Sequence, residues 1–229
     1  MAKTVAIVQS NYIPWKGYFD LINFSNEFVL FDDVQFTRRD WRNRNKIKTA
    51  QGLQWLTIPV AVKGKYCQSI RETKISGPDW GRKHWNSLVH SYRRAPYFSQ
   101  YEAILRPLFF TDERCLSLVN HRFITTICDI LGIETKITRS SDYQLTDGKS
   151  ERLLTICKQA GADVYLSGPA AKDYLDVERF RSNGIDVRFM DYSGYPEHHQ
   201  LFPPFEHAVT VLDLIFNEGI NAPRFMKSF

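Results

Sequence analysis

The chain has 229 residues and a mass of 26.7 kDa, with 43% hydrophobic and 24% charged residues. This apolar content suffices for a packed core in one large domain, which excludes an intrinsically disordered chain. No apolar run approaches the about 18 residues of a membrane span, and the N-terminus lacks the pattern of a signal peptide. The cysteines are far apart and form no CxxC pair, so we expect reduced thiols in a cytoplasmic protein at Cys67, Cys115, Cys128 and Cys157.

Short apolar runs in the first third of the chain predict β-strands. These strands are expected at residues 4–9, 27–36, 53–62 and 70–75. The loop SNYIPWKG and a helix at residues 18–24 separate the first two strands, and Asp32 and Asp33 end the apolar part of the second. The stretch from 53 to 75 reads as a small hairpin-like region that projects from the sheet.

Helical patterns dominate the middle of the chain, and short strands return in the last third. Helices are expected at residues 79–93, 98–108, 115–131, 151–160 and 210–217, and a helix or turn is expected at residues 170–183. Strands are expected at residues 134–141, 163–168 and 186–192. Such alternation favours a parallel α/β sheet of Rossmann-like type. We therefore predict a single α/β domain over residues 1–229, with a helical insertion at about 78–131.

The positive charge is concentrated in one segment, RRDWRNRNKIK at residues 38–48. The 30 basic and 25 acidic residues give a net charge of +5. This segment contains six basic residues and one acidic residue, which also sum to +5, so the remainder of the chain has 24 of each and is neutral. A broadly basic surface would indicate nucleic acid as the partner, whereas one local cluster indicates a compact anionic ligand.

The spacing within this segment is that of a strand. Arg42, Arg44, Lys46 and Lys48 alternate with other residues, so in an extended chain they would share one face, about 6.8 Å apart. Guanidinium groups bind phosphate or carboxylate oxygens in pairs. The alternative is a solvated edge strand whose charges deter aggregation. Trp41 within the run favours the ligand site over this alternative.

Two strand ends carry the remaining polar residues that could form a site. The first loop presents Gln9, Asn11 and Gly17 where open parallel sheets bind ligands. Asp32 and Asp33 end the second strand, and one could act as a general base while the other pairs with an arginine. They could equally be acids that balance the basic segment.

The stretch from Tyr165 to Tyr174 again joins a strand end to a helix start and could form the opposite wall of the same crevice. Ser167 could donate a hydrogen bond to a ligand or cap the helix. Lys149 and Arg152 could add positive charge there, although Arg152 could equally be a solvated helix residue. His198 and His199 are free enough for acid–base chemistry but are equally typical of a surface loop.

Several of these stretches resemble the WbqC-like family of bacterial proteins. The resemblance rests on SNYIPWKGYFDLI, FVLFDDVQFTRRDWRNRNKIKT, QWLTIPV, GKSERLL, GADVYLSGPAAKDYLD and VLDLIFNEG, and it covers about residues 4–219. Members are often encoded among genes for O-antigen and other surface polysaccharides or in natural-product pathways. The resemblance therefore implies a transferase that acts on an activated sugar or acyl substrate.

The chain departs from the family pattern in the first loop. Members usually read His-Gln-Pro where this chain has Val8, Gln9 and Ser10, so a catalytic histidine of relatives would be absent here. The strand, P-x-x-G turn, helix and acid-ended strand are also similar to nucleotidylyltransferase and pantothenate synthetase folds. The paired histidines that bind ATP in those enzymes are replaced by Pro14-Trp15-Lys16-Gly17-Tyr18.

The leading hypothesis is a group transferase with an anionic activated substrate, either a nucleotide sugar or an acyl or aminoacyl donor. The catalytic candidates are Asp32, Asp33 and Asn11. The expected substrate-binding residues are Gln9, Ser10, Tyr12, Pro14, Gly17, Gln35, Arg38, Trp41, Asn43, Arg44, Lys46, Lys149, Arg152, Ser167, Gly168 and Tyr174. No metal and no particular cofactor is predicted. The alternative is a nucleic-acid or tRNA binding module, or a non-catalytic accessory subunit of a biosynthetic complex; the local charge argues against nucleic acid.

Overall fold

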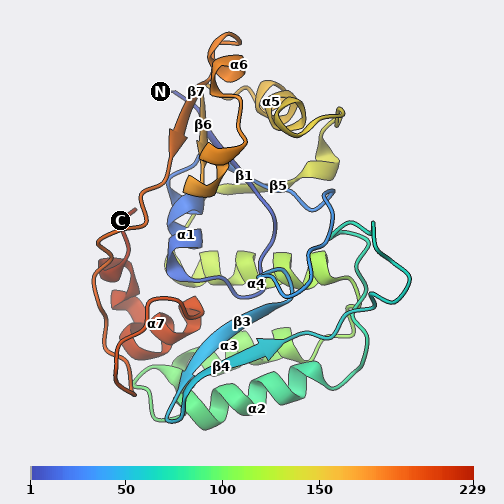
Figure 1. Cartoon of the computed structure of the whole chain (residues 1–229). Coiled ribbons are helices and arrows are strands. Elements are labelled where there is room, and N and C mark those ends of the chain that lie inside the picture. Colours follow the sequence, from blue (N-terminus) through green and yellow to red (C-terminus); the bar gives the residue numbers. More distant parts are fainter. Residues whose placement is uncertain (1) are drawn as a thin grey trace.

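The computed structural model describes residues 2–229 and contains a parallel five-stranded sheet beside a separate antiparallel hairpin (Figure 1). In spatial order the sheet consists of β5 (Lys136–Arg139), β2 (Glu27–Leu30), β1 (Thr4–Val8), β6 (Val164–Ser167) and β7 (Asp186–Phe189). Counted along the chain, the order is 3-2-1-4-5, so the direction of strand addition reverses between β1 and β6. The prediction of an α/β fold with a parallel sheet is confirmed.

Helices cover both faces of this sheet because its strands are apolar on both sides. Val5 and Ile7 pack in one hydrophobic cluster, while Ala6 between them packs in another, as the two-residue repeat of a strand requires. The first cluster includes residues of α5 (Lys149–Gln159) and α6 (Val177–Arg181), and the second includes residues of α1 (Lys16–Asn23) and α4 (Leu116–Leu131). The sheet is therefore a buried central layer.

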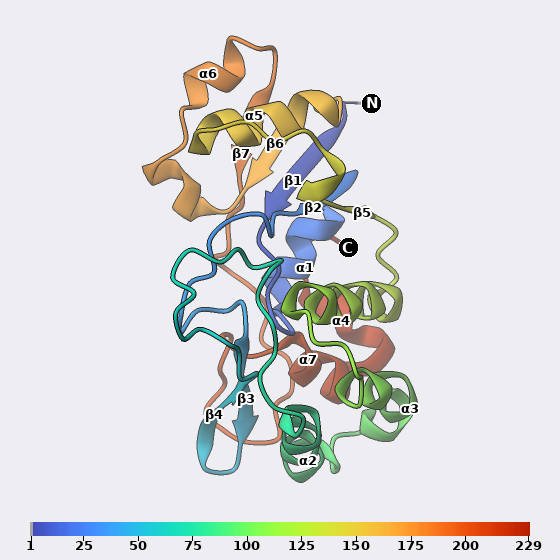
Figure 2. The same cartoon turned by 90° about the vertical axis from the view of Figure 1, so that its right-hand side faces the viewer.

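The second hydrophobic cluster continues into the part of the molecule below the sheet. This part contains β3 (Arg44–Thr49), β4 (Gly52–Thr57), α2 (Trp80–Tyr92), α3 (Phe98–Phe109) and α7 (Val211–Glu218). Figure 2 shows the β3–β4 hairpin on one side of this part and α3 and α4 on the other. Short 3₁₀ segments complete the chain as η1 (Ser140–Asp142), η2 (Pro169–Asp173) and η3 (Gly219–Phe225).

The helix predictions in the middle of the chain are confirmed in type and close to their expected bounds. Trp80, His84 and Leu88 are buried on one face of α2, as their spacing predicted. Gly132 ends α4 with a φ of 72°, a left-handed conformation that glycine adopts without strain. Within residues 2–229 no helix combines the length and hydrophobicity that a membrane span requires.

Several strand predictions were wrong in their bounds. The second strand ends at Leu30 instead of residue 36. A strand was predicted at residues 53–62, but β4 begins at Gly52 and already ends at Thr57. Residues 70–75 make isolated bridges only, because the Thr73 backbone and hydroxyl bond back to Ile70 and Ser69 in a turn. The hairpin therefore spans residues 44–57, and not 53–75.

The helix or turn predicted at residues 170–183 is present as two short helical segments with a break between them. The chain forms η2, then a break at residues 174–176, then α6. Asp176 begins the second helix, since its carboxylate accepts a hydrogen bond from the backbone of Arg179 at 3.1 Å.

Candidate functional site

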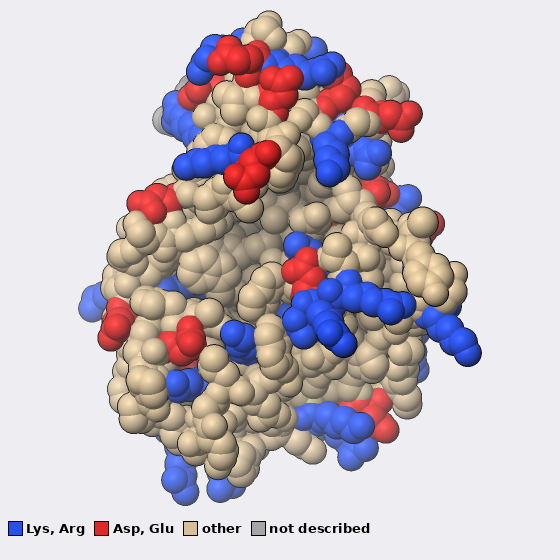
Figure 3. All heavy atoms as spheres, viewed as in Figure 1, with Lys and Arg blue, Asp and Glu red and all other residues tan. Residues whose placement is uncertain are grey.

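A cavity of about 950 Å³ lies beyond the carboxyl ends of β1, β2 and β6. We call it the large cavity. It sits where the strand order reverses, the place at which open α/β sheets bind ligands. Figure 3 shows a hollow on this face of the molecule, between the part that carries β6 and α6 and the part that carries the hairpin. Both basic and acidic side chains lie along the rim of the hollow, whose interior is mostly uncharged.

The structure brings many of the predicted site residues together in this cavity. Those that line it are Gln9, Asn11, Asp33, Gln35, Trp41, Lys149, Arg152, Ser167, Gly168 and Tyr174. They come from four chain segments that are distant in sequence, namely the loops after β1, β2 and β6 and the start of α5. Their role in ligand binding stays a prediction.

Helix α5 begins at the wall of the large cavity and makes that wall positive. Gly148, with a φ of 88°, precedes the helix, and both Gly148 and Lys149 line the cavity. The backbone N–H groups of a first helical turn lack helical partners and attract anions. Arg152 lines the same wall, and its Nε donates to the carbonyl of Thr146 at 3.0 Å, which holds the guanidinium in place.

Asp33 is the only carboxylate among the cavity-lining residues in the described chain. Its Oδ1 forms an ion pair with Arg71 at 2.9 Å, and its Oδ2 accepts a hydrogen bond from the Ser140 hydroxyl at 2.6 Å. Arg71 is more than half exposed, so this ion pair is open to solvent. The two partners fix the orientation of the carboxylate and leave further lone pairs on both oxygens.

Asp32 has a different environment from its neighbour. It is 4% exposed, its Oδ1 accepts from the backbone N–H of Ser10 at 2.8 Å, and its Oδ2 accepts from the hydroxyl of Ser117. The Ser10 hydroxyl is itself buried and accepts a hydrogen bond from Asn120 at 3.0 Å. Neither Asp32 nor Ser10 lines the large cavity. Their hydrogen bonds fix the loop after β1 on the side that faces away from the cavity.

The loop that carries Asn11 is fixed by several further contacts. The backbone N–H of Tyr12 donates to the carbonyl of Trp41 at 3.0 Å, and the Tyr12 hydroxyl bonds to His84 Nδ1 at 2.9 Å. Asn45 Nδ2 donates to the carbonyl of Ile13 at 2.7 Å. Ile13 has a φ of 42°, which is strained for a β-branched residue and persists only where the surroundings enforce it.

The basic segment at residues 38–48 is positioned differently from the prediction. None of its lysines and arginines lines the large cavity. Arg42 donates to the Gln9 carbonyl and to Asn11 Oδ1, and its guanidinium lies 3.6 Å from Asp40. Lys48 is buried and donates to the carbonyl of Pro204. These cations are bound within the fold because the strand lies in the hairpin and not across the mouth of the sheet.

Arg44 and Lys46 share one face of β3, as predicted, but this face carries two indole rings. The Arg44 guanidinium lies 4.1 Å from the ring centre of Trp55, and the Lys46 ammonium lies 5.2 Å from the same ring. Trp55 in turn lies 5.4 Å from Trp41, which does line the large cavity. Arg44 and Lys46 therefore contact the tryptophans and not the large cavity itself, which Trp41 lines.

The other predicted residues lie outside the lining of the large cavity. Tyr12 is fully buried, and burial raises the pKa of its hydroxyl well above the usual range. Asn43 is buried and donates to the Ile58 carbonyl at 2.8 Å, while Arg38 is exposed and donates to the Val62 carbonyl at 3.2 Å. Gly17 packs directly beneath the indole of Trp15, and Pro14 lines a smaller neighbouring cavity.

Aromatic residues that were not predicted form much of the wall of the large cavity. They are Trp15, Tyr18, Tyr165 and Tyr192. Tyr18 donates its hydroxyl to the Gln9 carbonyl at 3.0 Å, and burial raises the pKa of Tyr192 to about 12. Trp15 lies beside Pro14 in the loop after the first strand. The position of this loop at the end of a strand was the signal in the sequence that could have identified Trp15 as a cavity residue.

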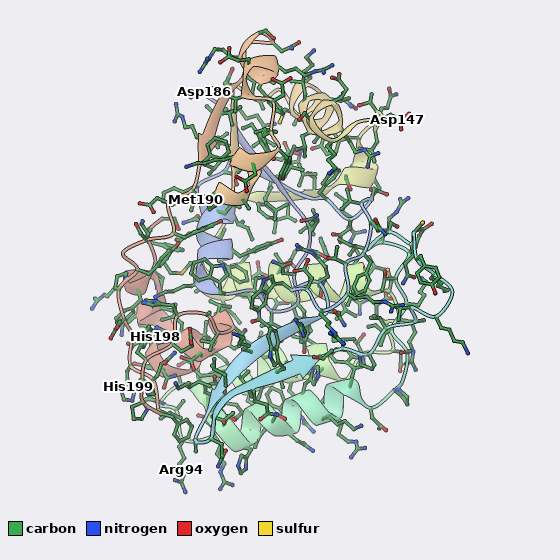
Figure 4. The ribbon with its side chains drawn as sticks, viewed as in Figure 1. Arg94, Asp147, Asp186, Met190, His198 and His199 are labelled. Atoms are coloured by element: carbon green, nitrogen blue, oxygen red, sulfur yellow. The ribbon has the colours of Figure 1, made fainter. Side chains whose placement is uncertain are left out.

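His198 and His199 lie on the segment beside α7, away from the large cavity (Figure 4). His198 is buried, and its Nε2 lies 2.8 Å from Asp213 Oδ1. The other oxygen of Asp213 accepts from the Tyr92 hydroxyl at 2.8 Å. This arrangement joins the segment to α2 and α7, which is a structural role. Within residues 2–229, no three His, Cys, Asp or Glu side chains are grouped to hold a metal ion.

Comparison with known proteins gives one family and one close relative. The model of the WbqC-like protein family matches residues 9–225. The chain is 51% identical over 226 residues to the uncharacterized protein Rv1507c of Mycobacterium tuberculosis, covering 98% of both chains. No solved structure matches.

Proposed function

The chain belongs to the WbqC-like protein family, and on that premise we propose that it is a group transferase whose large cavity binds an activated anionic donor. The donor class is a nucleotide sugar or an acyl or aminoacyl donor, used in the biosynthesis of a surface polysaccharide or a natural product. The observation that carries this proposal is the cavity itself, which lies at the reversal point of the sheet and is open to the positive end of α5.

The size and polarity of the large cavity fit such a donor. A volume of about 950 Å³ is at the upper end of the range for small-molecule sites, about 300–1,000 Å³. The aromatic wall of Trp15, Tyr165 and Tyr192 suits an apolar or planar part of the donor. Lys149 and Arg152, together with the first turn of α5, suit its phosphates.

The proposed reaction is a substitution at the activated carbon of the donor. A lone pair on an amine or hydroxyl of the acceptor forms the new bond to this carbon. The bond from the carbon to the leaving phosphate or thiolate breaks, and its electron pair departs with the leaving group. Lys149 and Arg152 stabilise the negative charge that develops on a leaving phosphate. The proton released by the acceptor passes to Asp33, the one lining carboxylate of the described residues, and then to solvent.

The end of β1 and the loop after it limit the chemistry in a way that fits Asp33 as the base. Val8 lines the large cavity where family members usually have histidine, so an apolar side chain stands where an imidazole would be. Ser10 is fully buried and is no substitute for it. The proposed fold relationship is to nucleotidylyltransferases and pantothenate synthetase, which the strand order supports, but without their ATP-binding histidines.

Thermal-shift screening of the purified chain against UDP-glucose, dTDP-glucose, acetyl-CoA and pyrophosphate tests the proposal, with calorimetry for each ligand that stabilises the protein. We expect at least one phosphorylated ligand to bind. The double substitution Lys149→Ala with Arg152→Ala should weaken its binding at least tenfold while the melting temperature of the free protein stays within about 2 °C. Lys158→Ala, an exposed lysine at the far end of the same helix, is the matched control.

Two results would contradict the proposal. The first is a folded protein that no phosphorylated ligand stabilises. The second is a ligand whose affinity, on a logarithmic scale, falls half as much with Lys158→Ala as with the double variant, which removes two charges and not one, because binding would then follow net charge and not the cavity wall.

A further inference from the structure

A second cavity of about 250 Å³ adjoins the large one. We call it the small cavity. It shares Asn11, Trp15 and Trp41 with the large cavity. Its remaining lining residues are Pro14, Asn45, His207 and Ala208. The two cavities therefore meet at a common wall made of one amide side chain and two indoles.

The indole of Trp41 is held in place by a stack of side chains behind it. Trp55 lies 5.4 Å away at an angle of 36°, and the Lys46 ammonium lies 6.0 Å from the ring centre of Trp41. The Trp41 carbonyl also accepts the backbone N–H of Tyr12 at 3.0 Å. Trp41 is nevertheless 38% exposed, so a rigid aromatic surface is presented to both cavities.

Trp15 on the shared wall is equally well fixed. A Cβ atom on Gly17 would approach its indole to 2.3 Å, so only glycine permits the observed position of the ring. Tyr192 and Tyr195 pack against it with ring centres 5.2 and 5.4 Å away. Two such ring walls in a volume of about 250 Å³ leave room for a single six-membered ring with its substituents.

Asn11 stands where the two cavities meet. Its Oδ1 is bound by the Arg42 guanidinium, and within residues 2–229 its Nδ2 has no protein partner. A hydrogen-bond donor is thus fixed at the point that molecules in either cavity can reach. A ring in the small cavity could place one of its substituents there, next to the reacting carbon of a donor in the large cavity.

We propose that the small cavity is the acceptor subsite and takes a single ring, from a sugar or an aromatic compound, that carries the attacking amine or hydroxyl. This inference rests on the proposed transferase function. Asn11 Nδ2 donates a hydrogen bond to the substrates at the junction. The acceptor loses its proton to Asp33 as its nitrogen or oxygen bonds to the carbon of the donor, while the leaving group departs toward α5.

Ligand-observed NMR by saturation transfer tests this subsite, with glucosamine and tyramine as ring-bearing amines and ethanolamine as an amine without a ring. The protein is measured with and without saturating pyrophosphate, which occupies the phosphate end of the large cavity. We expect one or both ring-bearing amines to bind and ethanolamine to give no signal. Glucosamine and tyramine distinguish a saturated sugar ring from an aromatic one.

A reciprocal pair of variants locates the binding. Ala208→Trp fills the small cavity from an exposed loop, and Ala170→Trp narrows the large one. The first should reduce the binding of the ring amines at least tenfold and leave pyrophosphate binding unchanged; the second should do the opposite. Trp41→Ala should weaken the ring amines at least tenfold, with Trp41→Phe retaining most of the affinity.

The outcomes separate this inference from the proposed function. Ring amines that bind equally well to Ala208→Trp, or that do not bind to a protein that binds pyrophosphate, overturn the acceptor subsite. Absence of pyrophosphate binding overturns the proposed donor site. The small cavity is then tested only by whether Ala208→Trp reduces the binding of the ring amines. Displacement of the ring amines by transfer RNA, with an affinity that falls steeply with salt, would make Trp41 part of an RNA-binding surface and would overturn the subsite as well.

Discussion

The two groups of basic residues, residues 38–48 and the pair Lys149 and Arg152, differ in what their charges contact. The first group is dense and accounts for the whole net charge of the chain. Yet Arg42 binds the first loop, Lys48 binds a backbone carbonyl, and Arg44 lies on an indole. The second group is sparse but lines the large cavity beside a helix N-terminus.

This difference shows that a cluster of charge in sequence does not by itself mark a ligand site. A guanidinium that is bound within the protein is a structural element, and its loss affects stability before it affects binding. Arg42 of the first group fixes the loop that carries Asn11, so this group supports the site without contacting a ligand. In the second group, Arg152 donates to one carbonyl, that of Thr146, yet both side chains line the large cavity and remain open to an anion.

The sharpest test of this contrast is Arg42→Met. The Arg42 side chain is 12% exposed and donates to the Gln9 carbonyl and to Asn11 Oδ1, so its removal takes two charged hydrogen bonds from the loop that carries Asn11. We expect the free energy of unfolding to fall by about 3 kcal/mol, measured by urea denaturation. Arg38→Met, which removes an exposed arginine from the same segment, should change it by less than about 0.5 kcal/mol. Equal losses would mean that the segment acts through its total charge.

The fold class was predictable because it depends on patterns within single elements. The apolar run at residues 4–9 and the helical spacing of Leu116 to Ile127 are local, and both elements form as expected. The bounds of strands depend on partners and were less accurate. Val34 and Phe36 suggested a strand that ran on past the two acids, but β2 ends at Leu30, and the Asp32 carboxylate accepts a hydrogen bond from the backbone of Ser10.

The candidate site was partly predictable for a related reason. Gln9, Asp33 and Ser167 lie at the ends of strands, and the ends of parallel strands meet at one edge of a sheet, so their proximity follows from the fold class. The position of the basic segment did not follow, because an antiparallel hairpin can pack anywhere its apolar face is covered. Ile47 provides that face here, and it is fully buried.

A buried lysine outside both groups gives the next test. Lys16 is 3% exposed, and its ammonium donates to the Pro196 carbonyl at 2.7 Å. Burial lowers the pKa of Lys16 to about 8, although Asp20 and Asp213 oppose the shift. The folded protein therefore releases this proton at a lower pH than the unfolded chain, whose pKa is 10.5. Stability from this residue is lowest below pH 8 and rises as the pH increases toward 10.5.

Lys16→Met removes this titration while keeping the length of the side chain. The difference in unfolding free energy, wild type minus variant, should rise by about 2 kcal/mol between pH 7.5 and 10, which is less than the full pKa difference because this range ends below the pKa of 10.5 of the unfolded lysine. Urea denaturation of both proteins at each pH measures it. The comparison cancels the tyrosines and cysteines that titrate in the same range. If the difference in unfolding free energy does not change with pH, the Lys16 ammonium is open to solvent, like Lys149 and Arg152.

The smallest expected effect concerns the face of β3 that supports Trp41. If Arg44 is a structural cation, it should be coupled to Trp55, whose ring centre lies 4.1 Å away. A double-mutant cycle with Arg44→Met and Trp55→Leu should give a coupling of about 0.5–1 kcal/mol, since cation–π pairs at exposed positions have this strength. The same cycle for Lys46 and Trp41, 6.0 Å apart, should give less. The contrary result is a coupling between Arg44 and Trp55 that is near zero in the free protein and becomes measurable only when an anion is bound. Arg44 would then be a ligand-binding residue and not a structural one, because its orientation would depend on the ligand.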